Sequence, residues 1–201
     1  MRKYHLAILT FIMLSMVLCS FIFCPELGLI QQIMMGYMIL YTLHEWEEIR
    51  FPGGFAKLMS KFFGIDVTKD KEDASHIPVV VLLIVITFVP FFTRSPLLAL
   101  VPVYLGLFEA LIHIVGIKIH KMKKPYTPGM ISAVLLGIFS IVVLTVFSKE
   151  QMVQGTEFLW GVLLTFLCFA IMQRTVIAVF GLGYKDLIAN MKKKLRGTAE
   201  H

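Results

Sequence analysis

Residues 26–48 read ELGLIQQIMMGYMILYTLHEWEE, and this stretch sets the architecture of the chain. An apolar run of about 20 residues can cross a bilayer as a helix, and here the run ends in the ionisable residues His44, Glu47 and Glu48. Ionisable residues also interrupt two later apolar runs, at FEALIH (108–113) and MQRTV (172–176). Because charges in hydrocarbon are costly, they are rare in membrane helices and usually mark functional sites. The stretch therefore predicts a membrane protein with a functional site among its helices.

The composition supports a membrane protein throughout. The chain has 201 residues, of which 58% are hydrophobic and only 16% are charged, whereas about a quarter of a soluble domain is charged. No strand-like alternation competes with the apolar runs. We therefore predict an all-α, polytopic membrane helix bundle that forms a single domain over 1–201. Its transmembrane helices, about six, are expected at 4–24, 26–44, 77–93, 96–117, 127–148 and 157–180.

Small and basic residues give further expectations about the bundle. Five glycines within the runs should allow close helix contact: Gly36, Gly106, Gly116, Gly137 and Gly161. Lys and Arg cluster before the first run, between the second and third, between the fourth and fifth, and after the last. The other connections hold only Arg94 and Lys149. By the positive-inside rule, both termini are expected in the cytoplasm.

Two stretches outside the apolar runs are expected to contact lipid. In the cytoplasmic connection 45–76, five apolar residues fall on one helical face, which predicts an interfacial amphipathic helix. The tail 184–201 is basic and repeats this pattern. The net charge of +6 then favours binding to anionic lipid rather than to nucleic acid. The residues on the apolar face of the connection are Phe55, Leu58, Met59, Phe62 and Phe63.

The ionisable residues are spaced as one site would require. Residues 44, 47 and 48 lie at i, i+3 and i+4, and residues 109 and 113 at i and i+4, so each set shares a helix face. At 1.5 Å per residue, the polar positions of three helices also reach a similar depth. Neutral His and ionised Glu are suitable ligands for divalent zinc or for a pair of iron ions. The candidate metal ligands are His44, Glu47, Glu48, Glu109, His113 and His120.

Three blocks of the chain resemble one known family. HEWEE at 44–48, EALIH at 109–113 and YTPGM at 126–130 resemble, in that order, the HXXEE-domain family of small bacterial membrane proteins. In that family the second block usually reads Asn-x-x-x-His, so Glu109 departs from the pattern. The resemblance implies an integral protein of the bacterial inner (plasma) membrane with an enzymatic site, and it does not specify the reaction.

These observations favour a membrane-embedded, metal-dependent enzyme acting on a lipid or another apolar substrate at the cytoplasmic leaflet. Glu47, Glu48 and Arg174 are its candidate catalytic groups, and Arg174 is either an anion clamp or the counter-ion of Glu109. One alternative is a metal-free intramembrane protease that depends on its glutamates. Another is a small proton-coupled transporter, because membrane acids and histidines also relay protons.

Overall fold

A computed structural model describes residues 4–24, 26–64, 68–120, 122–186, 188–189 and 192. Within these residues the chain is helical and has no strand, which confirms the predicted all-α class. The labelled helices are α1 (His5–Phe23), α2 (Leu29–Ile49), α3 (Phe55–Phe63), α4 (Lys69–Thr93), α5 (Pro96–Ile119), α6 (Met130–Lys149) and α7 (Gly155–Val179).

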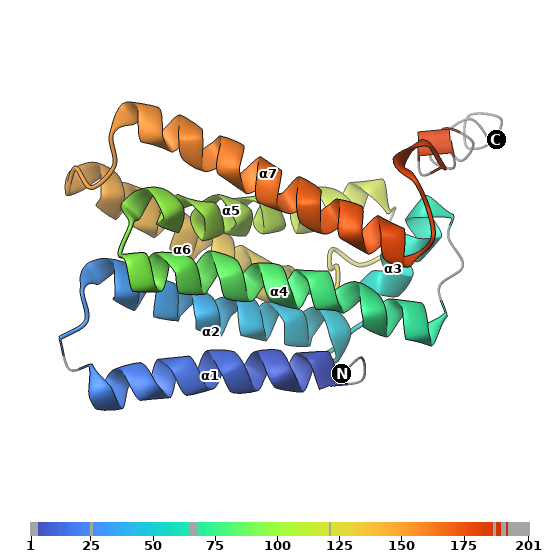
Figure 1. The fold of residues 1–201 in the computed structure, drawn as a ribbon. Coiled ribbons are helices and arrows are strands. Elements are labelled where there is room, and N and C mark those ends of the chain that lie inside the picture. Colours follow the sequence, from blue (N-terminus) through green and yellow to red (C-terminus); the bar gives the residue numbers. More distant parts are fainter. Residues whose placement is uncertain are drawn as a thin grey trace.

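The six long helices lie alongside one another, and the short helix α3 lies at one end of the bundle (Figure 1). Helix α1 begins, and helix α7 ends, at this same end. Within the part of the chain that the structure describes, five helices are long and apolar enough to cross a membrane: α1, α4, α5, α6 and α7. Helix α2 is as long but less apolar, because Gln31, Gln32 and its ionisable end lie within it. Six spans and a cytoplasmic location for both termini remain predictions.

Helix α2 occupies the middle of the bundle, where it packs against α1, α4, α5 and α6. Two of its tyrosines are almost fully buried, and each hydroxyl group has a partner on another helix. Tyr37 shares a 2.8 Å hydrogen bond with Ser140 of α6, and Tyr41 donates one of 2.7 Å to the Pro102 carbonyl of α5. Buried hydroxyl groups need such partners, so these bonds fix α5 and α6 against α2.

Four of the five predicted glycines stand where helices approach closely. A Cβ added to Gly137 would lie 2.6 Å from the Ala110 Cβ, and one added to Gly106 would lie 2.6 Å from the Ser140 hydroxyl. Gly36 faces the Phe139 ring and Gly161 faces Leu100 at similar distances. The expected role in close packing is confirmed for these four. At Gly116 an added Cβ would make only ordinary contacts, at 3.6 Å.

The helices around the connection extend further than their apolar runs. Helix α2 continues to Ile49, so the HEWEE block is helical, and it ends where the amides of Arg50 and Phe51 both donate to the Trp46 carbonyl. Helix α4 begins at Lys69 rather than at 77. Asp70 and Glu72 occupy its first turn, where negative charge stabilises a helix. Hydropathy alone could not reveal this polar turn.

Helix α3 forms inside the connection, as the amphipathic pattern predicts. Lys57 and Lys61 are exposed, whereas Phe55, Leu58 and Met59 are partly buried. Its place at the membrane surface remains a prediction. Most of the basic tail 184–201 lies outside the described residues.

Candidate metal centre

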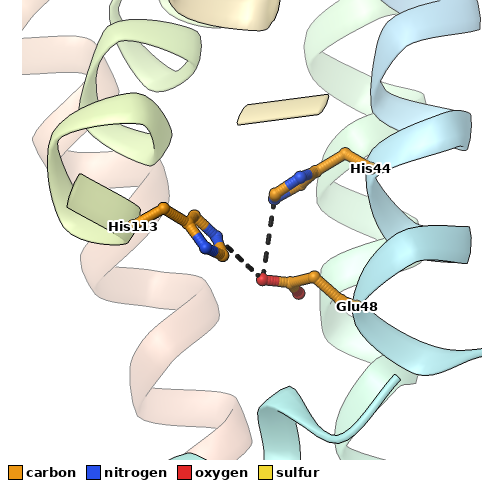
Figure 2. A group of neighbouring side chains, drawn as sticks. All are labelled: His44, Glu48 and His113. Carbon is orange, nitrogen blue, oxygen red and sulfur yellow. Dashed lines mark ion pairs between the residues drawn. The ribbon is translucent and has the colours of Figure 1, made fainter. Parts of the chain in front are cut away.

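Two histidines and two glutamates converge between α2 and α5. His44 and Glu48 lie one turn apart on α2, and Glu109 and His113 lie one turn apart on α5. Figure 2 shows His44, Glu48 and His113 pointing toward one another across the gap between the helices. The two imidazole rings are 5.1 Å apart and nearly perpendicular. The two i, i+4 pairs predicted from sequence therefore face each other.

The Nε2 atoms of both rings face carboxylate oxygens. His113 Nε2 lies 3.1 Å from Glu48 Oε1, and His44 Nε2 lies 3.6 Å from the same atom. Glu109 Oε2 lies 3.7 Å from His44 Nε2 and 3.9 Å from His113 Nε2. His44 is 3% exposed and His113 is 1% exposed, so both imidazole rings are buried.

Hydroxyl groups hold the opposite nitrogen of each ring. His44 Nδ1 lies 3.0 Å from the Ser132 hydroxyl, and His113 Nδ1 lies 3.0 Å from the Thr127 hydroxyl. The Thr127 hydroxyl also donates to the backbone carbonyl of His113, at 3.3 Å. Since it has only one proton, it accepts the Nδ1 proton of His113. When the ring is neutral, its Nε2 lone pair then faces the carboxylates.

This arrangement fits a bound cation. Electron-rich Nε2 and carboxylate atoms repel one another in a buried site unless a proton or a metal ion lies between them. His113 Nε2 has no hydrogen-bond partner among the described residues, although Glu48 is close. One ligand atom each from His44, Glu48 and His113 lies within 4.8 Å of the other two. Two imidazoles and a carboxylate form a typical set of ligands for zinc or iron. Hydrogen bonds to the outer nitrogens of ligand histidines are also typical of such sites.

The start of α6 forms one wall of this group. Gly129 has φ +91°, and a Cβ added there would lie 2.6 Å from Glu48 Cγ, 2.8 Å from His113 Cε1 and 3.0 Å from His44 Cε1. Only a residue without a side chain fits both this conformation and this space. On another side, the Phe55 ring of α3 lies 5.2 Å from the His113 ring. Backbone and aromatic carbon therefore enclose the imidazoles.

Glu47 points away from this group, toward the start of α6. Its Oε1 accepts hydrogen bonds from the Tyr126 hydroxyl at 2.7 Å and the Ile131 amide at 3.1 Å. Its Oε2 accepts from both the amide and the hydroxyl of Ser132. Partial burial and the bond to Glu47 raise the pKa of Tyr126 to about 12, so Tyr126 stays protonated and donates.

Two further residues predicted for the site lie outside this group of two histidines and two glutamates. Arg174 is exposed on α7, which packs against α4 and α5, and no ion pair among the described residues includes it. His120 ends α5 as its C-terminal cap, is partly buried and is not among the three residues that could share an ion.

Sequence reasoning missed four residues near the centre. Thr127, Gly129 and Ser132 lie beside the histidines. The YTPGM block contains the first two, and Ser132 follows it by two residues. Glu45 also belongs to the HEWEE block but was not a candidate, and it is only 3% exposed. Its Oε2 atom lacks a hydrogen-bond partner within the described part of the chain.

Comparison with known proteins identifies one relationship. A family model described as "Protein of unknown function with HXXEE motif" matches residues 35–144, which is more than half of the chain. The matched region contains the convergence and the start of α6. No curated protein and no solved structure matches the chain.

Proposed function

The chain belongs to the HXXEE family, and from that premise we propose that it is a membrane-embedded, metal-dependent enzyme acting on a lipid or another apolar substrate at the cytoplasmic leaflet. One observation carries the proposal. Two buried imidazole Nε2 atoms lie 3.1–3.9 Å from the oxygens of two carboxylates, in a bundle of apolar helices. Structural hydrogen bonding alone would not leave His113 Nε2 without a hydrogen-bond partner among the described residues.

The number of available ligands favours a single ion. Glu47 is occupied by four hydrogen bonds at the start of α6. The remaining group has two histidines and two glutamates, fewer carboxylates than the di-iron bundle sites use. We therefore assign His44, Glu48 and His113 as ligands of one zinc or iron ion. When bound, such an ion supplies a Lewis acid and a water of lowered pKa.

Glu109 is suited to move the proton. Its side chain is 21% exposed, more than that of Glu48 at 12% and those of the two histidines. It lies farther from His113 Nε2 than Glu48 does. A carboxylate that is close to the ion and also accessible can act as a general base, whose loss typically costs about 100- to 10,000-fold in rate.

An apolar substrate is favoured by the composition of the bundle. Among the residues that the structure describes, five helices are long and apolar enough to cross a membrane. Glu109 lies within one of them, α5, and its side chain is 21% exposed. A substrate that is already dissolved in the bilayer could therefore approach the site from within the membrane.

A reaction assay on reconstituted protein tests the proposal. Protein loaded with zinc or iron is incubated in vesicles of mixed bacterial lipids, and the lipids are analysed by mass spectrometry. Wild type should convert one lipid class. Glu109→Gln should keep the metal and lose at least about 100-fold in rate, whereas Glu48→Gln should lose both. Glu157→Gln, in the first turn of α7, is the matched control.

Two results would oppose this function. An unaltered rate in Glu109→Gln would remove Glu109 from the chemistry. No conversion of any lipid by the fully loaded wild type would oppose an enzyme acting on membrane lipids.

One observation favours proton-coupled transport as a second candidate. Glu45 is a buried acid on α2 with an unpartnered oxygen, next in sequence to His44. Buried acids in membrane helices often carry protons. Transport predicts proton flux into liposomes, measured with a pH-sensitive dye, that Glu45→Gln abolishes. An enzyme without a transport function predicts no flux.

A further inference from the structure

The Ser132 hydroxyl lies between a histidine of the centre and a glutamate outside it. Its oxygen is 3.0 Å from His44 Nδ1 and 3.1 Å from the Gly129 carbonyl, and it forms a short hydrogen bond to Glu47 Oε2. The hydroxyl has a single proton to donate. The direction of each hydrogen bond therefore depends on what its partners can accept.

Two of the three partners can only accept. The Gly129 carbonyl has no proton, and the Glu47 carboxylate already receives the amide protons of Ile131 and Ser132, one on each oxygen. The Ser132 proton must go to one of these acceptors, and the contact with Glu47 is the shorter. Ser132 then has no proton left for His44. His44 Nδ1 must carry a proton and donate it, so that in the neutral ring the lone pair is on Nε2.

We infer that Glu47 is a positioning residue: through Ser132 it holds His44 in the Nδ1-protonated tautomer, so that His44 Nε2 is free to bind a metal. This inference deepens the proposed function and rests on the metal site assigned there. It also divides the motif, since His44 and Glu48 face the ion while Glu47 orients one ligand and caps α6. Hydrogen bonds to the outer nitrogen of a ligand histidine commonly change metal affinity by about 10- to 100-fold.

His113 provides an internal control within the same molecule. Its Nδ1 faces Thr127, whose proton goes to the His113 carbonyl, and no carboxylate takes part. Changes at Glu47 or Ser132 should therefore alter the tautomer of His44 and leave that of His113 unchanged. A general loosening of the site would affect both rings.

The test uses nitrogen-15 histidine NMR on metal-free, full-length protein in detergent, at a pH at which both rings are neutral. Wild type should show the Nδ1-protonated tautomer at both rings. Glu47→Gln and Ser132→Ala should move His44 toward the Nε2-protonated tautomer and weaken zinc binding about 10- to 100-fold. Ser132→Thr, which keeps the hydroxyl, should restore both. Thr145→Ala removes a hydroxyl group from the same helix, where it donates to the Ile141 carbonyl, and should change neither.

The outcomes separate this inference from the proposed function. If Glu47→Gln and Ser132→Ala are less stable but keep the wild-type tautomer and zinc affinity, Glu47 has only a capping role and the inference is wrong. If wild type binds no metal, the proposed enzyme fails. The tautomers of the metal-free protein then still decide whether Glu47 orients His44. Ser132→Ala keeps the test valid if Glu47→Gln does not fold, because it leaves the Glu47 carboxylate in place.

Discussion

At the scale of single residues, the centre depends on contacts made by side chains that carry no metal-binding group. Hydroxyl groups of Thr127 and Ser132 hold the outer nitrogens of the histidines, and Gly129 leaves room for both rings. These three residues come from the loop before α6 and from its first turn. The start of α6 therefore positions the two histidines that we propose as ligands of one ion.

Replacement of Gly129 by alanine tests this dependence. The new Cβ would overlap Glu48 and both rings, and the positive φ would add strain of about 1–2 kcal/mol. Metal affinity should fall sharply, by isothermal titration with zinc, together with thermal stability. Gly181→Ala is the control, because Gly181 also has a positive φ, +75°, but nothing lies within 4 Å of its added Cβ. Equal affinities in the two variants would contradict the account.

Spacing along a helix predicted part of this site and could not predict the rest. Residues at i and i+4 lie nearly above one another, so both His–Glu pairs could be predicted. Glu47 and Glu48 point about 100° apart, and the sequence did not indicate which of them faces His113. The depth of a residue along a helix also does not show in which direction its side chain points around the helix axis. For this reason the prediction could not show that Arg174 would be exposed on α7.

At the scale of helices, the contact between α5 and α6 sets the position of two site residues. Gly137 of α6 faces Ala110, which is adjacent to Glu109 on α5. Tyr37 and Tyr41 fix α2 against the same two helices. A change in the separation of α5 and α6 would therefore move His113 and Glu109 relative to α2.

Gly137→Val should show this coupling. Two extra methyl groups and a Cβ would push against Ala110, and such overpacking typically costs about 1–3 kcal/mol. The unfolding temperature in detergent should fall, and zinc affinity should fall with it because α5 is displaced. Gly155→Val is the matched change in open space, because nothing lies within 4 Å of a Cβ added at Gly155. Wild-type zinc affinity in a destabilised Gly137→Val protein would show that the centre tolerates movement of α5.

Hydropathy predicted the six long helices well and their ends less well. Apolar runs report the part of a helix that contacts lipid or the core. The polar first turn of α4 carries acidic residues at the helix N-terminus, where negative charge is favourable. The HEWEE turn of α2 ends in backbone hydrogen bonds to the Trp46 carbonyl. These contributions do not depend on hydropathy, so the runs stop several residues before the helices do.

At the scale of the whole molecule, the connections between helices lie at one or the other end of the bundle. Helix α3 lies at the end where α1 begins and α7 ends, and the connection from α6 to α7 lies at the opposite end (Figure 1). The basic residues predict that the α3 end faces the cytoplasm. The metal centre, at the start of α6, would then lie near the inner leaflet.

Cysteine labelling in intact cells tests this orientation. In a chain with Cys19, Cys24 and Cys168 replaced, Glu150→Cys should react with a membrane-impermeant maleimide from outside. Lys57→Cys on α3 should react only after the membrane is permeabilised. Both positions are exposed, so access to the reagent depends on the side of the membrane. The reverse pattern would place the centre at the outer leaflet.

Metal content is the measurement on which the account rests. Protein purified in detergent is analysed by inductively coupled plasma mass spectrometry, as wild type, His44→Ala, His113→Ala and the control His76→Ala. His76 stacks on His5 and is not one of the three residues that could share an ion. The account predicts about one zinc or iron ion per chain in wild type and in the control, and loss of the ion in both other variants. Metal-free wild type after reloading, or full metal content in His44→Ala and His113→Ala, would contradict it.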